Sequence, residues 1–135
     1  LHRTVRGMSN SPEEALAEMQ FEFMRHKAES GESFVIVGRC AETVLKDYEG
    51  LVSFFITGDL ETKIKRIEEV RGFNREDAVE AIKRHDKNRK AYHNYYSDMK
   101  WGDSRNYDMC INSSRIGLDK TTDVIENYIR SRVEV

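Results

Sequence analysis

The sequence has few cysteines, no long apolar run and almost no net charge, and each shortage excludes a class of protein. The two cysteines, Cys40 and Cys110, lie far apart without metal-like pairing or a secretory signal, which predicts reduced thiols in the cytoplasm. No apolar run approaches the roughly 18 residues of a membrane span, so no membrane partner is expected. A formal net charge of −2 gives no overall basic field, which argues against a nucleic-acid partner.

What is present is ordinary for one globular domain. The chain has 135 residues, of which 39% are hydrophobic and 34% are charged, and this length can bury a core without metal or disulfide. We therefore predict a single domain over residues 1–135. Residues 1–10 show no periodicity and predict an irregular segment.

Helix signals are clear at both ends of the chain. Ser11-Pro12 predicts the start of a first helix that ends near Gly31, and we expect it to bury Leu16, Met19, Phe23 and Met24. Further helices are predicted over residues 41–46, from Leu60 to the break at Gly72, over residues 75–99, and from about Asp119. The inward positions expected in these later helices are Leu60, Ile64, Ile67, Ala78, Ala81, Ile82, Val124, Ile125, Tyr128 and Ile129, with Lys63 and Arg66 turned away.

Three short apolar segments, at residues 34–37, 51–57 and 107–111, predict strands. The first is continuously apolar, as expected of a strand buried on both faces. Strands that alternate with helices predict an α/β fold: a parallel open sheet with helices on both faces. Ligands bind such sheets at the carboxyl ends of the strands, which here carry Gly38-Arg39-Cys40, Gly58-Asp59 and Asn112-Ser113-Ser114.

The first candidate site is the Gly38-Arg39 pair. Glycine permits close approach to the backbone, and an arginine at a strand tip can fork onto a phosphate or a carboxylate. The alternative is a surface arginine that pairs with Glu42 or Asp47. Cys40, between a strand and a helix, is a weaker candidate for a nucleophile, because no base is identifiable.

The second candidate is a basic and aromatic segment at residues 83–101, preceded by Arg66 and Arg71. A mobile helix with several arginines could close over a polyphosphate and neutralise developing charge. Two alternatives are a solvated helix and a nucleic-acid surface on which bases stack. The third candidate, Asn112-Ser113-Ser114, could face a nucleobase or could simply cap the last helix.

Three blocks together resemble the cytidylate-kinase-like family of P-loop nucleoside-monophosphate kinases. The blocks read SFVIVGRCAETVLKDY, VSFFITGDLETKIKRI and IKRHDKNRKAYHNYYSDMKWGDSRNYDMCINSS, in that order. The resemblance extends over roughly residues 13–130. It implies a P-loop kinase-like sheet with a helical lid at about residues 71–101.

The resemblance also implies a reaction, phosphoryl transfer from ATP with Mg²⁺ to a nucleoside monophosphate. Gly38 and Arg39 would bind the substrate's phosphate. The remaining roles would fall to the lid cations Arg66, Arg84 and Arg89, to Asp86, which orients them, and to Asn112, Ser113 and Ser114 near the ATP base. Such a reaction needs positioning and charge neutralisation more than a nucleophilic side chain.

Two departures from the family pattern qualify this expectation. Cytidylate kinases proper carry acids on both sides of the Gly-Arg pair, where this chain has Val37 and Cys40. No G-x-x-x-x-G-K-[ST] phosphate loop occurs, so ATP and Mg²⁺ would be held largely by groups outside this chain.

We therefore expect a carboxy-terminal portion of a nucleotide kinase, without its first strand and phosphate loop and inactive as an isolated chain. A further chain segment or a second copy could complete the sheet. The alternative function is a non-catalytic nucleotide- or anion-binding regulatory module.

Overall fold

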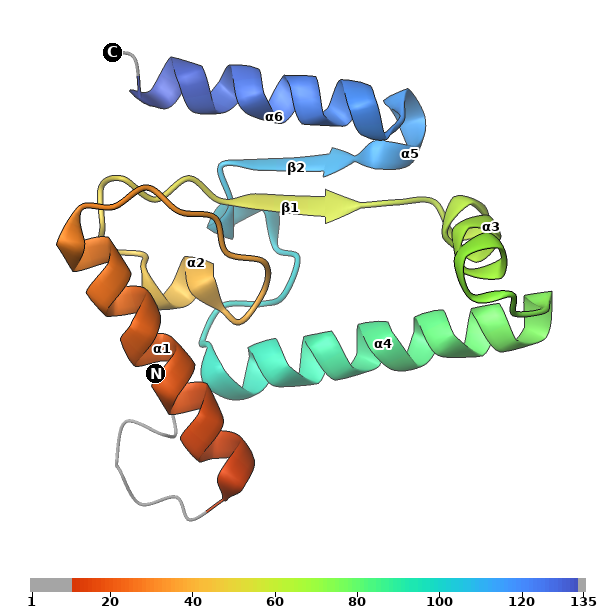
Figure 1. Cartoon of the computed structure of the whole chain (residues 1–135), viewed down its shortest axis with the longest axis horizontal. Coiled ribbons are helices and arrows are strands. Elements are labelled where there is room, and N and C mark those ends of the chain that lie inside the picture. Colours follow the sequence, from red (N-terminus) through yellow and green to blue (C-terminus); the bar gives the residue numbers. More distant parts are fainter. Residues whose placement is uncertain (1–10, 134–135) are drawn as a thin grey trace. The chain divides into compact units, whose positions relative to one another are not determined.

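The computed structural model describes residues 11–133, which form two compact units (Figure 1). The first unit contains residues 11–51 and 90–106, and the second contains residues 52–89 and 107–133. Helix α4 (Arg75–Tyr96) contributes to both, so the predicted lid-like segment is divided between the units at Arg89 and Lys90. The irregular segment predicted for residues 1–10 lies outside the described residues.

Helix α1 (Pro12–Ser30) begins and ends where the sequence predicts. The Ser11 hydroxyl accepts a hydrogen bond from the backbone N–H of Glu14 at 3.5 Å, and Pro12 occupies the first helical position. Gly31 ends the helix in the left-handed conformation at φ 80°. These signals are local, and they fixed both ends of the helix.

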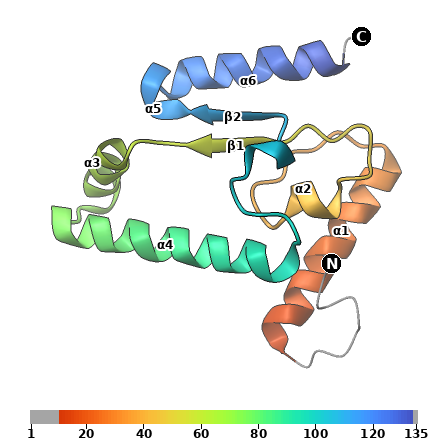
Figure 2. The same cartoon turned by 180° about the vertical axis from the view of Figure 1, so that it is seen from behind.

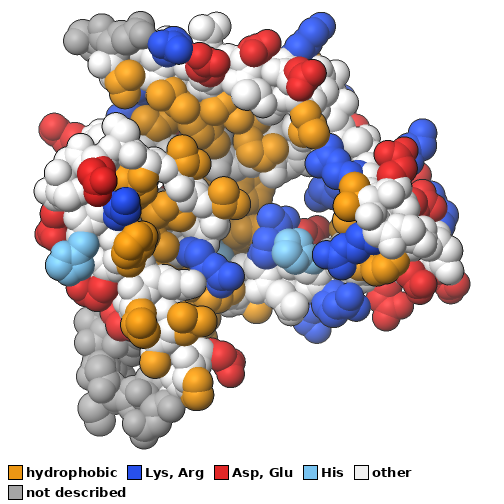
Figure 3. All heavy atoms as spheres, in the orientation of Figure 1, with side chains coloured by type: hydrophobic (Ala, Val, Ile, Leu, Met, Phe, Trp, Pro, Cys, Tyr) orange, Lys and Arg blue, Asp and Glu red, His pale blue; other side chains and the backbone are white. Residues whose placement is uncertain are grey.

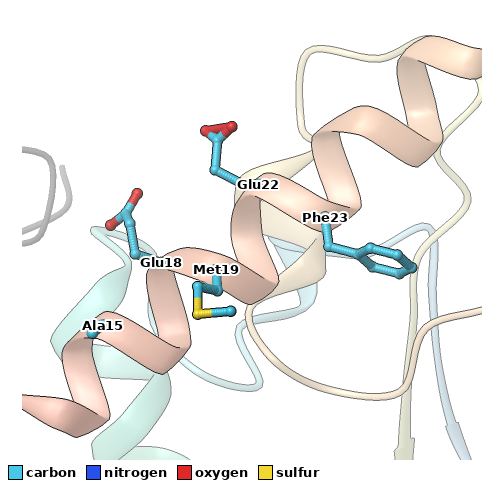
Figure 4. A pocket seen from close by; sticks show the side chains of 5 residues that line it. All are labelled: Ala15, Glu18, Met19, Glu22 and Phe23. Atoms are coloured by element: carbon cyan, nitrogen blue, oxygen red, sulfur yellow. The ribbon is translucent and has the colours of Figure 1, made fainter.

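The predicted buried face of α1 is wrong at three of its four positions. The buried residues of α1 are Ala17, Phe21 and Met24, whereas Leu16, Met19 and Phe23 are 56%, 69% and 62% exposed. Both sets have helical spacing, so periodicity could not choose between them. Met19 and Phe23 instead line an open pocket on α1 together with Ala15, Glu18 and Glu22 (Figure 4).

The strand predicted for residues 34–37 does not form. Phe34 and Ile36 pack against the first-unit core, whereas Val35 and Val37 are each 90% exposed. A strand needs a neighbour to exchange backbone hydrogen bonds with. The only strands in the described part of the chain pair with each other, so this segment has no such neighbour.

The rest of the first unit packs against the buried side of α1. It comprises helix α2 (Ala41–Val44), the turns that follow it, the last turns of α4, and the short 3-10 helix η2 (Ser104–Asn106). Phe21 meets Tyr96 edge to face, with ring centroids 5.4 Å apart. The buried residues of this core are Ala17, Phe21, Met24, Cys40, Leu45 and Tyr96.

The second unit is built on two parallel strands, β1 (Phe54–Thr57) and β2 (Met109–Asn112). Phe54 pairs with Met109 and Thr57 with Asn112, so both strands end at the same edge. Helices α3 (Leu60–Arg71) and α4 lie between the strands in sequence, which confirms the predicted parallel connection. Both strands are shorter than predicted, and the sheet has two strands among the described residues.

Short helix α5 (Ser113–Ile116) and helix α6 (Leu118–Val133) complete the second unit. Helix α6 runs alongside the strand pair, where Tyr128 meets Phe54 edge to face at 5.7 Å (Figures 1 and 2). The predicted inward residues Val124 and Ile129 of α6 are 36% and 37% exposed. Across the described residues, no helix has both the length and the apolar character that crossing a membrane requires.

The core between α3 and α4 is small. Ile64, Ala78 and Ile82 are buried there, and Ile67, Phe73 and Val79 pack around them. The prediction of Ile64, Ile67, Ala78 and Ile82 as inward residues is confirmed, whereas Leu60 is 50% exposed because it begins the helix at the edge of this core.

Candidate functional site

The Gly38-Arg39-Cys40 turn has an unusual backbone. All three residues have positive φ, at 73°, 57° and 57°, and the N–H of Ala41 donates to the carbonyl of Gly38 at 3.2 Å to close the turn. Glycine adopts this region freely, but a side chain there costs about 1–2 kcal/mol per residue. Arg39 and Cys40 are therefore strained, and the surrounding structure must hold them.

Arg39 itself lies against an aromatic ring of the same unit. Its guanidinium carbon is 5.2 Å from the centroid of the Tyr92 ring, a distance at which a cation is attracted to the ring face. No carboxylate in the described structure pairs with Arg39, so the alternative in which it pairs with Glu42 or Asp47 is wrong. The side chain is exposed, as a ligand-binding arginine requires.

Cys40 faces the other way, into the core. It is 3% exposed, and its thiol lies 3.9 Å from the backbone carbonyl of His93. Burial, with the nearby negative charge of Glu42 as a smaller cause, raises the pKa of Cys40 to about 12. A protonated, buried thiol is a poor nucleophile, which excludes Cys40 from that role.

Two buried polar contacts fasten helix α2 to the end of α4. His93 Nε2 lies 2.5 Å from Glu42 Oε1, and both side chains are nearly buried, at 6% and 11% exposure. The hydroxyls of Thr43 and Ser97 are 2.7 Å apart and also buried. Residues 40–43 and 93–97 thus form one clamp behind the Arg39 turn.

In the second unit, the ends of the two strands are joined by their own polar side chains. Asn112 donates to the Asp59 carboxylate at 2.9 Å, and Ser114 accepts a hydrogen bond from the Asp59 backbone N–H at 2.9 Å. Asn112 also caps α5, because its Oδ1 accepts from the Ser114 N–H, and Ser113 donates to the carbonyl of Thr57. The loop therefore caps α5 and not the last helix, α6, so the capping alternative is right in kind but wrong in the helix, and a place beside a nucleobase stays a prediction.

Only part of the predicted lid constellation comes together. Asp86 pairs with Arg89 at 2.8 Å, as expected of a residue that orients a cation. Arg84 is two residues from Asp86, so it projects from nearly the opposite side of α4, about 200° away. Arg66 is exposed on α3, and neither Arg66 nor Arg84 has an ion pair within the described residues.

Lys63 is a cation whose orientation the sequence reasoning missed. It was expected to point away, but its ammonium lies 3.8 Å from Asp86, and its side chain is only 36% exposed. Its α3 position is one turn before Arg66, on the same side of the helix. Lysine and arginine side chains gather over this part of the second unit (Figure 3).

Most aromatic residues of the segment at 83–101 are buried or half-buried rather than arranged on the surface. Tyr96 is 4% exposed and packs against Phe21, and His93 is equally buried. Tyr92 is partly buried beneath Arg39, and burial raises its pKa. The basic residues at 83–90 of α4 are exposed, whereas of the three tyrosines of α4 only Tyr95 is exposed, at 39%.

Where the ATP phosphates and Mg²⁺ would bind stays a prediction. Among residues 11–133, no group of three or more His, Cys, Asp or Glu side chains is placed to hold a metal ion. The polar groups at the strand ends are occupied by one another, and the sequence has no Gly-rich phosphate loop.

Two parallel strands are joined through helices α3 and α4, which carry cations, and Arg39 lies on a turn held by a buried clamp. Together these features indicate a nucleotide kinase-like scaffold. Comparison with known proteins supports this class. The model of the cytidylate kinase-like family matches residues 1–115, so the chain belongs to this family, as the sequence motifs predicted.

A solved structure of an uncharacterized protein from Eubacterium ventriosum is similar, with a TM-score of 0.85 and 49% sequence identity. That match covers 89% of this chain and 75% of the other. No curated protein matched the sequence.

Proposed function

We propose that this chain serves ATP-dependent phosphoryl transfer to a nucleoside monophosphate and that Arg39 binds the phosphate of that acceptor. The observation that carries the proposal is the placement of Arg39, an exposed arginine without a carboxylate partner on a turn that the core holds in a strained shape. A permanently charged, forked guanidinium suits a phosphate monoester.

The second unit would supply charge neutralisation. Arg66, Arg84 and Arg89 would approach the transferring phosphoryl group, and Asp86 holds Arg89 at 2.8 Å and Lys63 at 3.8 Å. Arginines so placed can contribute about 10³–10⁵ in rate to phosphoryl transfer. ATP would supply the phosphoryl group, with Asn112, Ser113 and Ser114 near its base, and Mg²⁺ would neutralise its charge. We assign the binding of ATP and Mg²⁺ largely to groups outside these 135 residues.

A second candidate is a nucleotide- or anion-binding regulatory module without catalysis. The environment of Cys40 favours it. Cytidylate kinases proper resemble this chain but carry an acid at this position, whereas the Cys40 thiol is buried and its pKa is raised to about 12. The position therefore supplies no negative charge to orient an acceptor or a metal ion.

The test begins with the native polypeptide that contains this sequence, whose intact mass is compared with 15.8 kDa. Its ATP turnover is then followed in a coupled assay with CMP, dCMP, UMP, AMP and GMP as acceptors. We expect turnover with at least one acceptor, and we expect Arg39→Ala to lower kcat/KM by more than about tenfold without loss of folding.

Lys46→Ala is the matched control, because it removes an exposed positive charge from the same unit. Unchanged turnover in Arg39→Ala would remove Arg39 from the site. If the native polypeptide shows no turnover while CMP or Mg·ATP raises its melting temperature, the regulatory candidate is correct instead.

A further inference from the structure

The geometry points to Tyr92 as a positioning residue for Arg39, with the Glu42–His93 pair keeping Arg39 available. We propose that the Tyr92 ring holds the Arg39 guanidinium in the position where it binds the acceptor's phosphate. His93 binds the Glu42 carboxylate, which would otherwise compete with that phosphate for the guanidinium. The inference rests on the proposed function of Arg39 in phosphate binding.

The first step concerns the arginine side chain. An exposed arginine samples many rotamers, and ordering it on binding a ligand costs conformational entropy. Attraction to the face of Tyr92 reduces the number of rotamers of Arg39 before the ligand binds. No carboxylate in the described structure accepts a hydrogen bond from its guanidinium. Arg39 is therefore partly preorganised for an anion.

The second step concerns the platform. Tyr92 precedes His93 on α4, and three contacts fix residues 40–43 to residues 93–97: Cys40 to the His93 carbonyl, Glu42 to the His93 ring, and Thr43 to Ser97. Both partners of the Arg39–Tyr92 contact are thus attached to the same buried clamp. The clamp also keeps the strained Arg39 backbone from relaxing.

The third step concerns Glu42, an acid three residues after Arg39. A carboxylate so near in sequence could form an ion pair with Arg39 and displace a phosphate. In the structure Glu42 is 11% exposed, and His93 Nε2 lies 2.5 Å from its Oε1. His93 therefore holds the Oε1 atom of Glu42 within the buried clamp.

The experiment compares binding of CMP with binding of cytidine, which lacks the phosphate, by calorimetry on the native polypeptide. Tyr92→Leu removes the ring and is expected to weaken CMP binding about threefold to tenfold while leaving cytidine binding unchanged. Tyr92→Phe is the matched control, because it keeps the ring and removes only the hydroxyl. A CMP affinity that stays within about twofold assigns the effect to the ring rather than to a hydrogen bond between the hydroxyl and Arg39.

A double-mutant cycle shows whether Tyr92 acts through Arg39. In an Arg39→Ala background, Tyr92→Leu should cause no further loss of CMP affinity. An equal loss in both backgrounds, or no loss in Tyr92→Leu alone, would overturn the positioning role.

A measurement that needs no ligand separates this inference from the proposed function. The NMR signal of the Arg39 Nε–H should be shifted upfield by the ring in the wild type and in Tyr92→Phe, and should return to the random-coil position in Tyr92→Leu. An unchanged signal in Tyr92→Leu would refute the contact. A shifted signal together with full CMP affinity in Arg39→Ala would refute phosphate binding by Arg39 and leave the contact standing.

The role of His93 has its own rescue test. His93→Leu removes the contact between His93 and Glu42 and should weaken CMP binding at least as much as Tyr92→Leu. Adding Glu42→Gln should restore most of the affinity, because the competing charge is gone. A merely structural role for His93 predicts that the double variant binds CMP no better than His93→Leu. Circular dichroism and the melting temperature establish that each variant is folded.

Discussion

The two units of this chain hold their cations in opposite ways. The first unit fixes a single arginine on a strained turn, backed by aromatic rings and by polar contacts that are almost fully buried. The second unit has a core of three buried residues and carries most of its lysines and arginines on exposed helix faces. Arg39 is thus held by a ring and a buried clamp, whereas Lys63 and Arg89 of the second unit are held by an ion pair with Asp86.

Under the proposed function, this difference would suit the two tasks of phosphoryl transfer. An acceptor must be held in one geometry, because effective molarity depends on position. Cations that surround the transferring group must move to admit and release substrate, and mobile elements have few buried apolar contacts. The small core of Ile64, Ala78 and Ile82 fits the second description, and the aromatic core around Phe21 fits the first.

The largest expected effect comes from breaking the first unit. Phe21 is 1% exposed, so Phe21→Ala should lower the free energy of unfolding by about 3–5 kcal/mol, as measured by urea denaturation. Phe23→Ala, on the exposed side of the same helix, should cost about 0.5 kcal/mol or less.

The two thiols report where the Phe21→Ala protein has opened. At pH 8, Cys40 is protonated, because burial raises its pKa to about 12, and it should alkylate slowly in the wild type and rapidly in Phe21→Ala. Cys110 is exposed in the second unit and should react at one rate in both proteins. Equal stability of Phe21→Ala and Phe23→Ala would show that the assigned face of α1 is wrong.

A smaller effect is expected in the second unit. Ile64→Ala should cost about 2–4 kcal/mol, because Ile64 is fully buried. Hydrogen exchange followed by mass spectrometry should speed up mainly over residues 60–89. Val70→Ala, on the same helix and 75% exposed, is the control, and exchange that rises equally in the first unit would argue against two separate units.

The smallest effect is expected at the strand ends. Asn112→Ala removes the cap of α5 and the bond to Asp59, and we expect a loss of about 1 kcal/mol, seen as a lower urea midpoint. Asn127→Ala, in the exposed interior of α6, should be neutral or slightly stabilising. If both variants behave alike, the contacts of Asn112 contribute nothing and the loop is free for another role.

Features decided by neighbouring residues could be predicted from the sequence. The ends of α1 followed from Ser11 and Gly31, and the parallel strand pair followed from alternating strand and helix signals. The buried side of α1 did not, because Phe21 and Phe23 both lie on apolar stripes and only a distant partner, Tyr96, selects one. A continuous apolar run at residues 34–37 could not reveal that no strand pairs with it.

The candidate site shows the same limit. Arg39 stood out because it follows a glycine after an apolar run, but nothing local indicated that Tyr92 lies beneath it. Glu42 and His93 are 51 residues apart in sequence, and each alone reads as an ordinary polar residue. Lys63 was assigned to the wrong side of α3 because the partner that turns it inward, Asp86, lies on another helix.

Because the backbone at Arg39 is left-handed, selection for stability and selection for function should favour different residues at this position. Glycine or asparagine would occupy φ 57° with less strain than arginine, so a library screened only for thermal resistance should drift toward those residues at this position. A library screened for ligand capture should retain arginine and accept the lower melting temperature. The residue found most often at position 39 would then show whether a population of variants had been selected for stability or for ligand binding.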